Sequence, residues 1–161
     1  KTDGNFLRVC REVANSYPDI EMDSWFVDIM AANLINKNIR NKFEIFVLPN
    51  LYGDIITDEA AEIQGGVGTA GSANVGTNYA IFEAIHGSAP RMVEDGLADR
   101  ANPASLLKAA AMMVAHIGYE DRAKKLNSAI SRADELIGAR MTGFKDGATT
   151  REYGEIVGNY L

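Results

Sequence analysis

The sequence predicts an α/β fold, because segments with helical spacing alternate with a segment of strand character. Apolar residues between Phe6 and Tyr17 recur every three to four positions, as in an amphipathic helix, and Pro18 follows its end. A second helix is expected over residues 24–35. Residues 42–49, KFEIFVLP, are apolar and rich in β-forming residues, so we expect a buried strand that ends at its proline. Helices and strands in this order are typical of α/β proteins.

The segments that follow extend this pattern. A helix is expected over 54–64. Residues 65–76, GGVGTAGSANVG, contain five glycines and only small side chains, which predicts a tightly packed loop whose backbone approaches something closely. Pro103 near the first turn and Gly118 at the end bound a helix over 102–118. The same patterns predict a short strand at 20–22, a strand followed by a loop at 80–90, a helix at 119–138 and a short helix from about Thr149.

Composition and charge exclude several classes of function. The chain has 161 residues, 47% hydrophobic and 24% charged, as expected for one globular domain or parts of two. A net charge of −6 without a Lys/Arg cluster argues against a nucleic-acid partner. We find no apolar run of membrane-spanning length and no secretory signal. A single cysteine, Cys10, rules out an internal disulfide and favours a reducing compartment: the cytoplasm, or the mitochondrial matrix in a eukaryote. Because the chain starts without methionine, we expect a processed or truncated start.

Two aspartates, Asp54 and Asp58, lie one helical turn apart in NLYGDIITDEA. Like charges at this spacing weaken an isolated helix by a few tenths of a kcal/mol. The helix dipole favours acids in a first turn, which explains Asp54 better than Asp58. A divalent cation such as Mg²⁺ or Mn²⁺ would instead turn the repulsion into attraction, because it binds carboxylate oxygens. The spacing alone leaves both explanations open.

A histidine, His86, lies in IHGSAP between an apolar strand and a Gly/Pro loop. A lone histidine here is commonly structural or simply exposed. It is also suited to stack on, or hydrogen-bond to, a planar ligand, with Gly87 allowing a close backbone approach. His116 lies in an apolar helix, where we expect it to pack between helices. Asp28 follows the apolar triplet WFV and is typical of a helix N-terminus.

Four segments are much more specific together than any is alone. VLPNLYGDIITDEA, the small-residue loop, AIFEAIHGSAP and NPASLLKAAAMMVAHIG occur in this order and spacing in the β-decarboxylating dehydrogenases, the family of isocitrate, 3-isopropylmalate and homoisocitrate dehydrogenases. The chain resembles the C-terminal half of such an enzyme over residues 1 to about 136, and PNLYGD is most similar to the isocitrate enzymes. The resemblance implies the isocitrate/isopropylmalate dehydrogenase-like α/β fold, not a Rossmann fold with a GxGxxG helix start. It places residues 1–64 in the smaller, dimer-forming domain and residues 65–161 in the larger, cofactor-binding domain.

The resemblance also implies roles for individual residues. Asp54 and Asp58 resemble the two metal-binding aspartates of one subunit, and Asp28 resembles the aspartate that the partner subunit contributes. His86 and Asn102 resemble the residues beside the adenine, and Gly68 resembles a glycine whose backbone lies near the cofactor. Further cofactor-binding positions are implied at Gly87, Ser88, Ala89 and Arg91. The catalytic lysine and tyrosine, and the substrate-binding arginine and serine residues, are expected upstream of Lys1, so we expect no catalytic residue of this kind in the chain.

The implied reaction is the metal-dependent oxidative decarboxylation of isocitrate to 2-oxoglutarate, with Mg²⁺ or Mn²⁺ and reduction of NAD or NADP. The substrate would be a 2-hydroxy tricarboxylic or dicarboxylic acid, and the protein a homodimer or higher homo-oligomer with shared active sites. NAD-using members often hold aspartate at the position of Arg91. Arginine there suits a 2′-phosphate and favours NADP slightly. Residues 135–145, however, show no clear Tyr/Arg partners of the kind that other NADP enzymes use. The alternatives are a 3-isopropylmalate or homoisocitrate dehydrogenase, an inactive fragment, or a non-catalytic regulatory subunit. The last predicts loss of a metal aspartate, yet all three are present.

Overall fold

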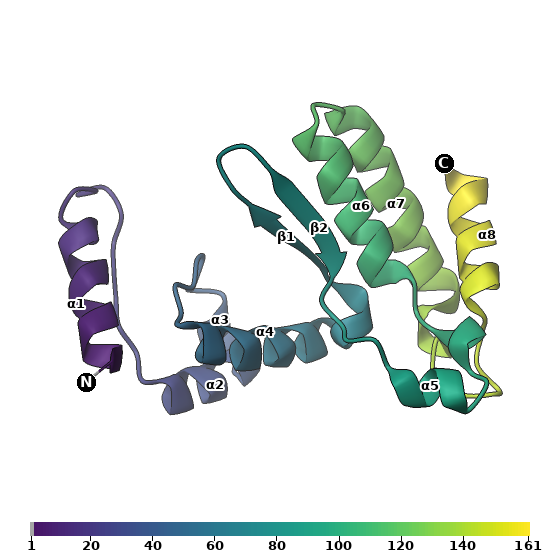
Figure 1. Cartoon of the computed structure of the whole chain (residues 1–161), viewed down its shortest axis with the longest axis horizontal. Helices are drawn as coiled ribbons and strands as arrows, with labels where there is room; N and C mark the ends of the chain where they lie inside the picture. The colour runs from purple at the N-terminus through teal and green to yellow at the C-terminus, as the bar shows by residue number, and fades with distance from the viewer. Residues whose placement is uncertain (1) are drawn as a thin grey trace. The chain divides into compact units, whose positions relative to one another are not determined.

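The computed structural model describes residues 2–161, apart from the side chain of Val67 (Figure 1). The chain divides into two compact units, one ending at Ile63 and one running from Gln64 to Leu161. Helices dominate both, and the β-structure is a small antiparallel sheet in the second unit, which gives the mixed α/β character that the sequence predicts.

The first unit consists of helices joined by segments without regular secondary structure. They are α1 (Thr2–Ala14), α2 (Val27–Ile35), α3 (Lys37–Arg40) and α4 (Asn50–Gln64), whose last residue belongs to the second unit. Helix α4 begins directly after Pro49, whose carbonyl accepts a hydrogen bond from the Gly53 amide at 2.8 Å. The helix therefore starts four residues before the predicted position, and Asp54 is not in its first turn.

The predicted strands at 42–49 and 20–22 are wrong. Neither segment forms a strand, and Ile45 and Val47 are 84% and 69% exposed. A strand needs a neighbour for its backbone N–H and C=O groups. Among the described residues, strands occur only in the second unit, where β1 and β2 pair with each other. The apolar composition of 42–49 predicts burial, but most of these residues are exposed.

The second unit opens with a hairpin of β1 (Gly71–Val75) and β2 (Ala80–Ala84), paired antiparallel with Gly71 opposite Ala84. The loop predicted over 65–76 is therefore wrong for its second half, which is a strand. Its first half holds a short 3-10 helix, η1 (Val67–Thr69). The predicted close approach is confirmed at Gly71, where an added Cβ would lie 2.5 Å from the Ala109 backbone nitrogen. Residues 66–71, GVGTAG, have GxGxxG spacing, but they precede a strand rather than open a helix, so they do not form a Rossmann fingerprint.

Three helices build the core of the second unit: α6 (Ala104–His116), α7 (Glu120–Ile137) and α8 (Thr150–Tyr160). Helix α6 lies between the hairpin and α7, and α7 packs against α8 (Figure 1). Short helices α5 (Pro90–Glu94), η2 (Ala98–Arg100) and η3 (Gly138–Arg140) lie in the connections. The buried core is formed by Ala104, Ala129, Ile130, Ala133, Ile137, Ala148, Tyr153 and Val157.

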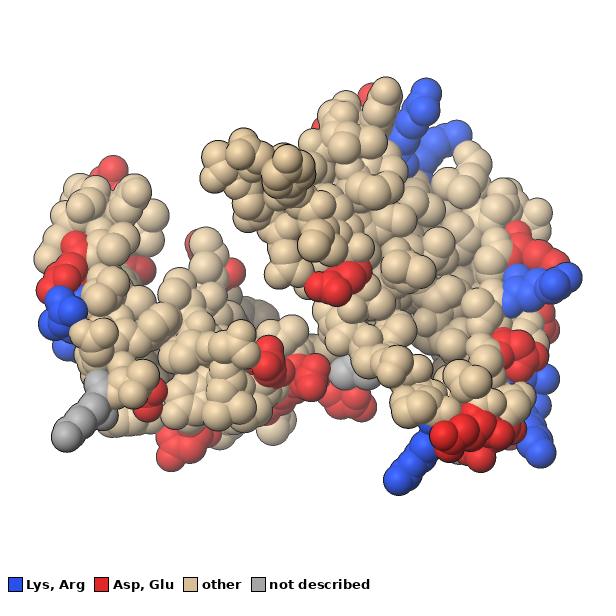
Figure 2. Space-filling model, in the orientation of Figure 1, with Lys and Arg blue, Asp and Glu red and all other residues tan. Residues whose placement is uncertain are grey.

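The final helix starts where the sequence predicts. The Thr149 hydroxyl accepts from the Glu152 amide at 3.1 Å, and the Glu152 carboxylate accepts from the Thr149 amide at 2.6 Å. This reciprocal capping box pairs backbone donors that the first turn of a helix would otherwise leave free. No helix within residues 2–161 is long and apolar enough to cross a membrane. On the face shown in Figure 2, Lys and Arg side chains are interspersed with Asp and Glu.

Candidate functional site

The acidic pair lies on the outer surface of α4. Asp54 and Asp58 are both exposed and one turn apart, and the Asn50 amide donates to the Asp54 carboxylate at 3.2 Å. The helix dipole favours a carboxylate within the first turn of a helix. Because α4 begins at Asn50, both acids lie beyond that turn. The dipole therefore explains neither residue. The pair keeps the mutual repulsion that an oxygen-binding cation would relieve.

The third candidate ligand, Asp28, lies in the first turn of α2 and is exposed. Its carboxylate accepts from the neighbouring Ile29 amide at 2.8 Å. Within residues 2–161, no three His, Cys, Asp or Glu side chains come together in a group that would hold a metal ion. The chain thus presents the carboxylates of Asp54 and Asp58 together on α4, and that of Asp28 separately on α2. Completing a metal site with Asp54 and Asp58 needs further oxygen donors from protein, substrate or water.

The loop after β2 carries most of the candidate cofactor-binding residues. His86, Gly87 and Ser88 are exposed, and the His86 Nδ1 lies 3.0 Å from the Gly87 carbonyl oxygen. Ala89 has a φ of 45°, a left-handed conformation that is unusual for alanine and that turns the chain into α5. Arg91, the second residue of α5, is exposed.

Gly68 and Asn102 lie against each other. A Cβ added to Gly68 would be 3.3 Å from the Asn102 Cβ, so the absence of a side chain lets η1 approach this residue. The Asn102 side-chain oxygen accepts from the Ala104 amide at 3.0 Å, which fixes the side chain at the start of α6. The assignment of oxygen and nitrogen in this amide follows from that hydrogen bond.

A residue that the sequence reasoning missed connects these segments. Ser105 is fully buried on α6; its hydroxyl accepts from the Ile85 amide at 3.2 Å and donates to the Ala70 carbonyl. These groups adjoin the candidate residues: Ala70 follows η1, and Ile85 immediately precedes His86. The structure therefore brings together the three chain segments that carry Gly68, His86 and Asn102. The sequence signal was weak, because serine near a helix start is ordinary.

A polar network lies one turn further along α6. The Lys108 ammonium donates to the Thr69 carbonyl at 2.8 Å and is 3.4 Å from the Asp134 carboxylate. The Tyr153 hydroxyl donates to Asp134 at 2.6 Å, and burial together with this carboxylate raises the pKa of Tyr153. The network borders a cavity of about 380 Å³ whose lining also includes Gln64, Asn102 and Met141.

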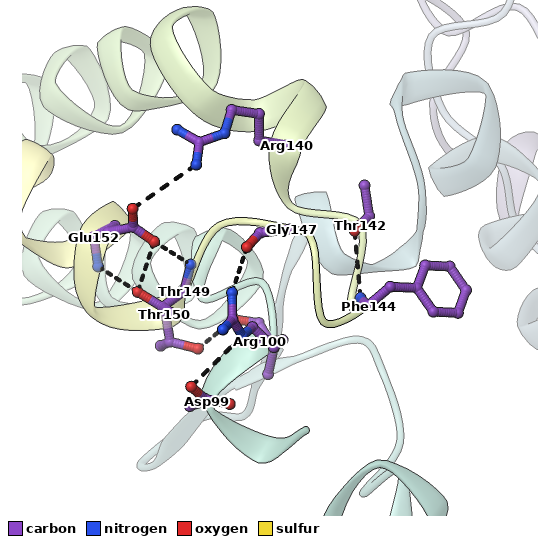
Figure 3. Close-up of polar contacts among 10 residues, drawn as sticks. Asp99, Arg100, Arg140, Thr142, Phe144, Gly147, Thr149, Thr150 and Glu152 are labelled. Atoms are coloured by element: carbon purple, nitrogen blue, oxygen red, sulfur yellow. Dashed lines mark hydrogen bonds and ion pairs between the residues drawn. The ribbon is translucent and has the colours of Figure 1, made fainter. Parts of the chain in front are cut away.

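The segment before Asn102 is held by the C-terminal part of the chain (Figure 3). The Arg100 guanidinium donates to the Gly147 carbonyl and lies 3.6 Å from Asp99. The Thr150 hydroxyl donates to the Ala101 carbonyl at 2.6 Å. These contacts link the residues just before α6 to those that open α8.

Comparisons with known proteins cover most of the chain. A model of the isocitrate/isopropylmalate dehydrogenase family matches residues 1–157. The chain is 49% identical over 134 residues to the NADP isocitrate dehydrogenase of Rickettsia prowazekii, which is 83% of this chain and 27% of that protein. It is 42% identical over 132 residues to the 3-isopropylmalate dehydrogenase of Archaeoglobus fulgidus, with 82% of this chain and 39% of that protein covered.

The chain is also similar to a mitochondrial subunit and to a protein of known crystal structure. The alpha subunit of the human mitochondrial NAD isocitrate dehydrogenase is 42% identical over 129 residues, which is 80% of this chain and 34% of that protein. The crystal structure of the isocitrate dehydrogenase from Methylococcus capsulatus matches with a TM-score of 0.84 and 36% identity, over 98% of this chain and 45% of that chain. The chain thus spans less than half the length of each of these proteins.

Proposed function

Because the chain belongs to the isocitrate/isopropylmalate dehydrogenase family, we propose that it is the C-terminal part of an isocitrate dehydrogenase. The complete enzyme would oxidise and decarboxylate isocitrate to 2-oxoglutarate while reducing a nicotinamide cofactor. The observation that carries this proposal is the exposed pair of Asp54 and Asp58, which lies beyond the first turn of α4. Residues 1–64 would contribute to the smaller, dimer-forming domain and residues 65–161 to the larger, cofactor-binding domain.

The donor set of α4 fits a hard divalent cation. Asp54 and Asp58 offer carboxylate oxygens on one helix face, which is the chemistry that Mg²⁺ and Mn²⁺ prefer. A bound cation would act as a Lewis acid on the substrate oxygen during oxidation and loss of CO₂. Asp28, which the chain does not place in a metal-binding group, would serve the site of a partner subunit in a homodimer or larger homo-oligomer.

The hairpin unit would hold the adenosine half of the cofactor. We propose that His86 and Asn102 contact the adenine, and that Gly68 and residues 87–89 bring backbone close to the adenosine. Arg91 is exposed and makes no side-chain hydrogen bond or ion pair with any residue of the described chain. Its guanidinium is thus available to bind a 2′-phosphate, which favours NADP slightly over NAD.

A 3-isopropylmalate or homoisocitrate dehydrogenase is the second candidate. Its support is the 42% identity with the Archaeoglobus fulgidus 3-isopropylmalate dehydrogenase. The contacts that would distinguish these substrates, like the catalytic lysine and tyrosine, are expected outside residues 1–161. A regulatory subunit is less well supported, because the chain retains all three aspartates.

The test uses the complete protein that contains this chain. We expect NAD(P)H formation from isocitrate with Mg²⁺ or Mn²⁺, and little from 3-isopropylmalate; the opposite preference would replace the first candidate by the second. Asp54→Asn and Asp58→Asn should each raise the metal concentration for half-maximal rate at least about tenfold and lower kcat, because one charged ligand is lost. Glu59→Gln, on another face of the same helix, is the control with the same change in charge. Unchanged metal dependence in both aspartate variants would refute the metal assignment.

A further inference from the structure

We propose that Ser105 is a positioning residue for the cofactor's adenosine, because its hydroxyl fixes two loops against the start of α6. The inference rests on the proposed function and deepens it. Ser105 has no exposed surface, so it is not placed to touch a ligand. It would act through the residues next to the groups that it binds.

The hydroxyl of Ser105 uses both of its hydrogen-bonding modes. It donates its single hydrogen to the Ala70 carbonyl and accepts the Ile85 amide proton at 3.2 Å. Both hydrogen bonds are partly buried and Ser105 itself has no exposed surface, so water would replace the hydroxyl only in part. Removing the hydroxyl would leave a donor and an acceptor unpaired at one point, which is more disruptive than the loss of a solvent-exposed hydrogen bond.

The sequence separations connect this hydroxyl to the proposed adenosine site. Ala70 lies two residues after Gly68, Ile85 lies one residue before His86, and Ser105 lies three residues after Asn102. One side chain therefore sets the relative position of three segments that are distant in the sequence. Gly68 already contacts Asn102, so a shift of the backbone at Ala70 would also change the contact between Gly68 and Asn102.

The network of Lys108 does not duplicate this role. Lys108 lies one turn further along α6 and binds the Thr69 carbonyl, which holds the η1 segment a second time. Within the described part of the chain its polar partners are Thr69 and Asp134, neither of which belongs to the loop after β2. The loop that starts at Ile85 and contains His86 is tied to α6 by the Ser105 hydroxyl.

The test compares variants of the complete protein in two independent measurements. Alanine is smaller than serine, so the Ser105→Ala variant should fold. In the absence of cofactor, amide hydrogen exchange at residues 85–91 should become roughly tenfold faster, because the Ile85 amide loses its partner. The KM for NADP should rise roughly tenfold, while kcat and the KM for isocitrate stay within about twofold.

Three controls separate positioning from general destabilisation. Ala129→Gly disturbs the buried interior of α7, so it should lower the melting temperature without raising the KM for NADP. Ser105→Thr keeps the hydroxyl and should recover most of the NADP affinity. In a double-mutant cycle with His86→Ala, the effect of Ser105→Ala should shrink, because a displaced His86 no longer matters once it is truncated.

The outcomes distinguish this inference from the function on which it rests. If Ser105→Ala lowers stability but changes neither exchange at 85–91 nor the KM for NADP, the inference is wrong and the proposed function stands. If the KM rises equally in Ala129→Gly, the effect is one of stability, and the inference is again overturned. If the wild-type protein reduces neither NADP nor NAD with a 2-hydroxy acid, the proposed function fails and the inference falls with it.

Discussion

The Tyr153 hydroxyl offers a direct test of how the second unit is stabilised. Tyr153 is fully buried in the core, and its hydroxyl donates to the Asp134 carboxylate at 2.6 Å. Tyr153→Phe keeps the ring and its buried area, so the substitution removes this hydrogen bond and a longer one from the same hydroxyl to the Ile130 carbonyl at 3.4 Å. A hydrogen bond to a charged group contributes about 1.5–3 kcal/mol.

The lower end of that range applies here. After the substitution, Asp134 retains Lys108 at 3.4 Å, and its side chain is 33% exposed, so water replaces part of the lost interaction. We therefore expect a loss of about 1.5 kcal/mol in the free energy of unfolding. For a chain of this size, the loss corresponds to a fall of roughly 3–6 °C in melting temperature. Removing the ring as well, in Tyr153→Ala, should cost about 3–5 kcal/mol.

The assay is urea unfolding of the 161-residue chain followed by circular dichroism, because α6, α7 and α8 dominate the helix content of the second unit. Fluorescence of Trp25, the chain's single tryptophan, reports on the first unit and serves as an internal comparison. In a double-mutant cycle, Tyr153→Phe and Asp134→Ala should be strongly coupled, since both remove the same hydrogen bond. Additive effects would refute the reasoning.

The same residue predicts a pH dependence. Burial, followed by the Asp134 interaction, raises the pKa of Tyr153 above its ordinary value of about 10. The folded-state pKa exceeds the unfolded one, so this contribution is fully present below pH 10 and is lost as the pH rises further. Above pH 10 the wild-type chain should lose up to about 1.4 kcal/mol per pH unit more than Tyr153→Phe. Parallel stability curves for the two proteins between pH 8 and 11 would contradict this.

Three further predictions concern a helix end, the cofactor and the isolated chain. Thr149→Ala should cost about 1 kcal/mol in unfolding experiments through loss of the capping box, and Thr149→Ser should restore it. The amide of Thr149 and then its hydroxyl lower the pKa of Glu152, and alanine keeps the amide but lacks the hydroxyl, so the difference between the two proteins should shrink as acidic solution protonates that carboxylate. Arg91→Asp should shift the kcat/KM ratio of the complete enzyme from NADP toward NAD by one or two tenfold steps, because a carboxylate repels a 2′-phosphate. If the wild type prefers NAD and the variant leaves the ratio unchanged, Arg91 points away from the ribose. The 161-residue chain alone should form no NAD(P)H from isocitrate, because it spans less than half of its relatives, and measurable turnover would disprove the expected upstream lysine and tyrosine.

Helices were predictable where one face is apolar and local chemistry marks the ends. The capping residue Thr149 correctly predicted the start of α8, and Pro103 the approximate start of α6. The strand predicted at 42–49 was wrong for a physical reason: apolar composition predicts burial, but a strand also needs a partner, and within the described residues β1 and β2 pair with each other and not with this segment. Helix α4 was misplaced at its start, because Asn50 to Gly53 show no helical signal of their own.

The candidate site was accessible to sequence reasoning only in part. The spacing of Asp54 and Asp58 left a cation open beside a structural explanation, and the family resemblance supplied the metal assignment. The same resemblance supplied the cofactor-binding residues, which stay predictions: Gly68, His86, Gly87, Ser88, Ala89, Arg91 and Asn102. The buried contact of Ser105 with Ala70 and Ile85 was not predictable, because it joins residues that are 35 and 20 positions apart. Contacts of this kind depend on the packing of the hairpin against α6, which no local pattern encodes.

The exposed apolar segment at 42–49 has a practical consequence for anyone who produces this chain. Ile45, Phe46 and Val47 are exposed next to backbone groups that no strand pairs, in a stretch of high β-propensity. Such a segment is a template for adding strands from other copies, which leads to insoluble aggregates. Expression of residues 1–161 will therefore require dilute handling or a lysine replacing Ile45.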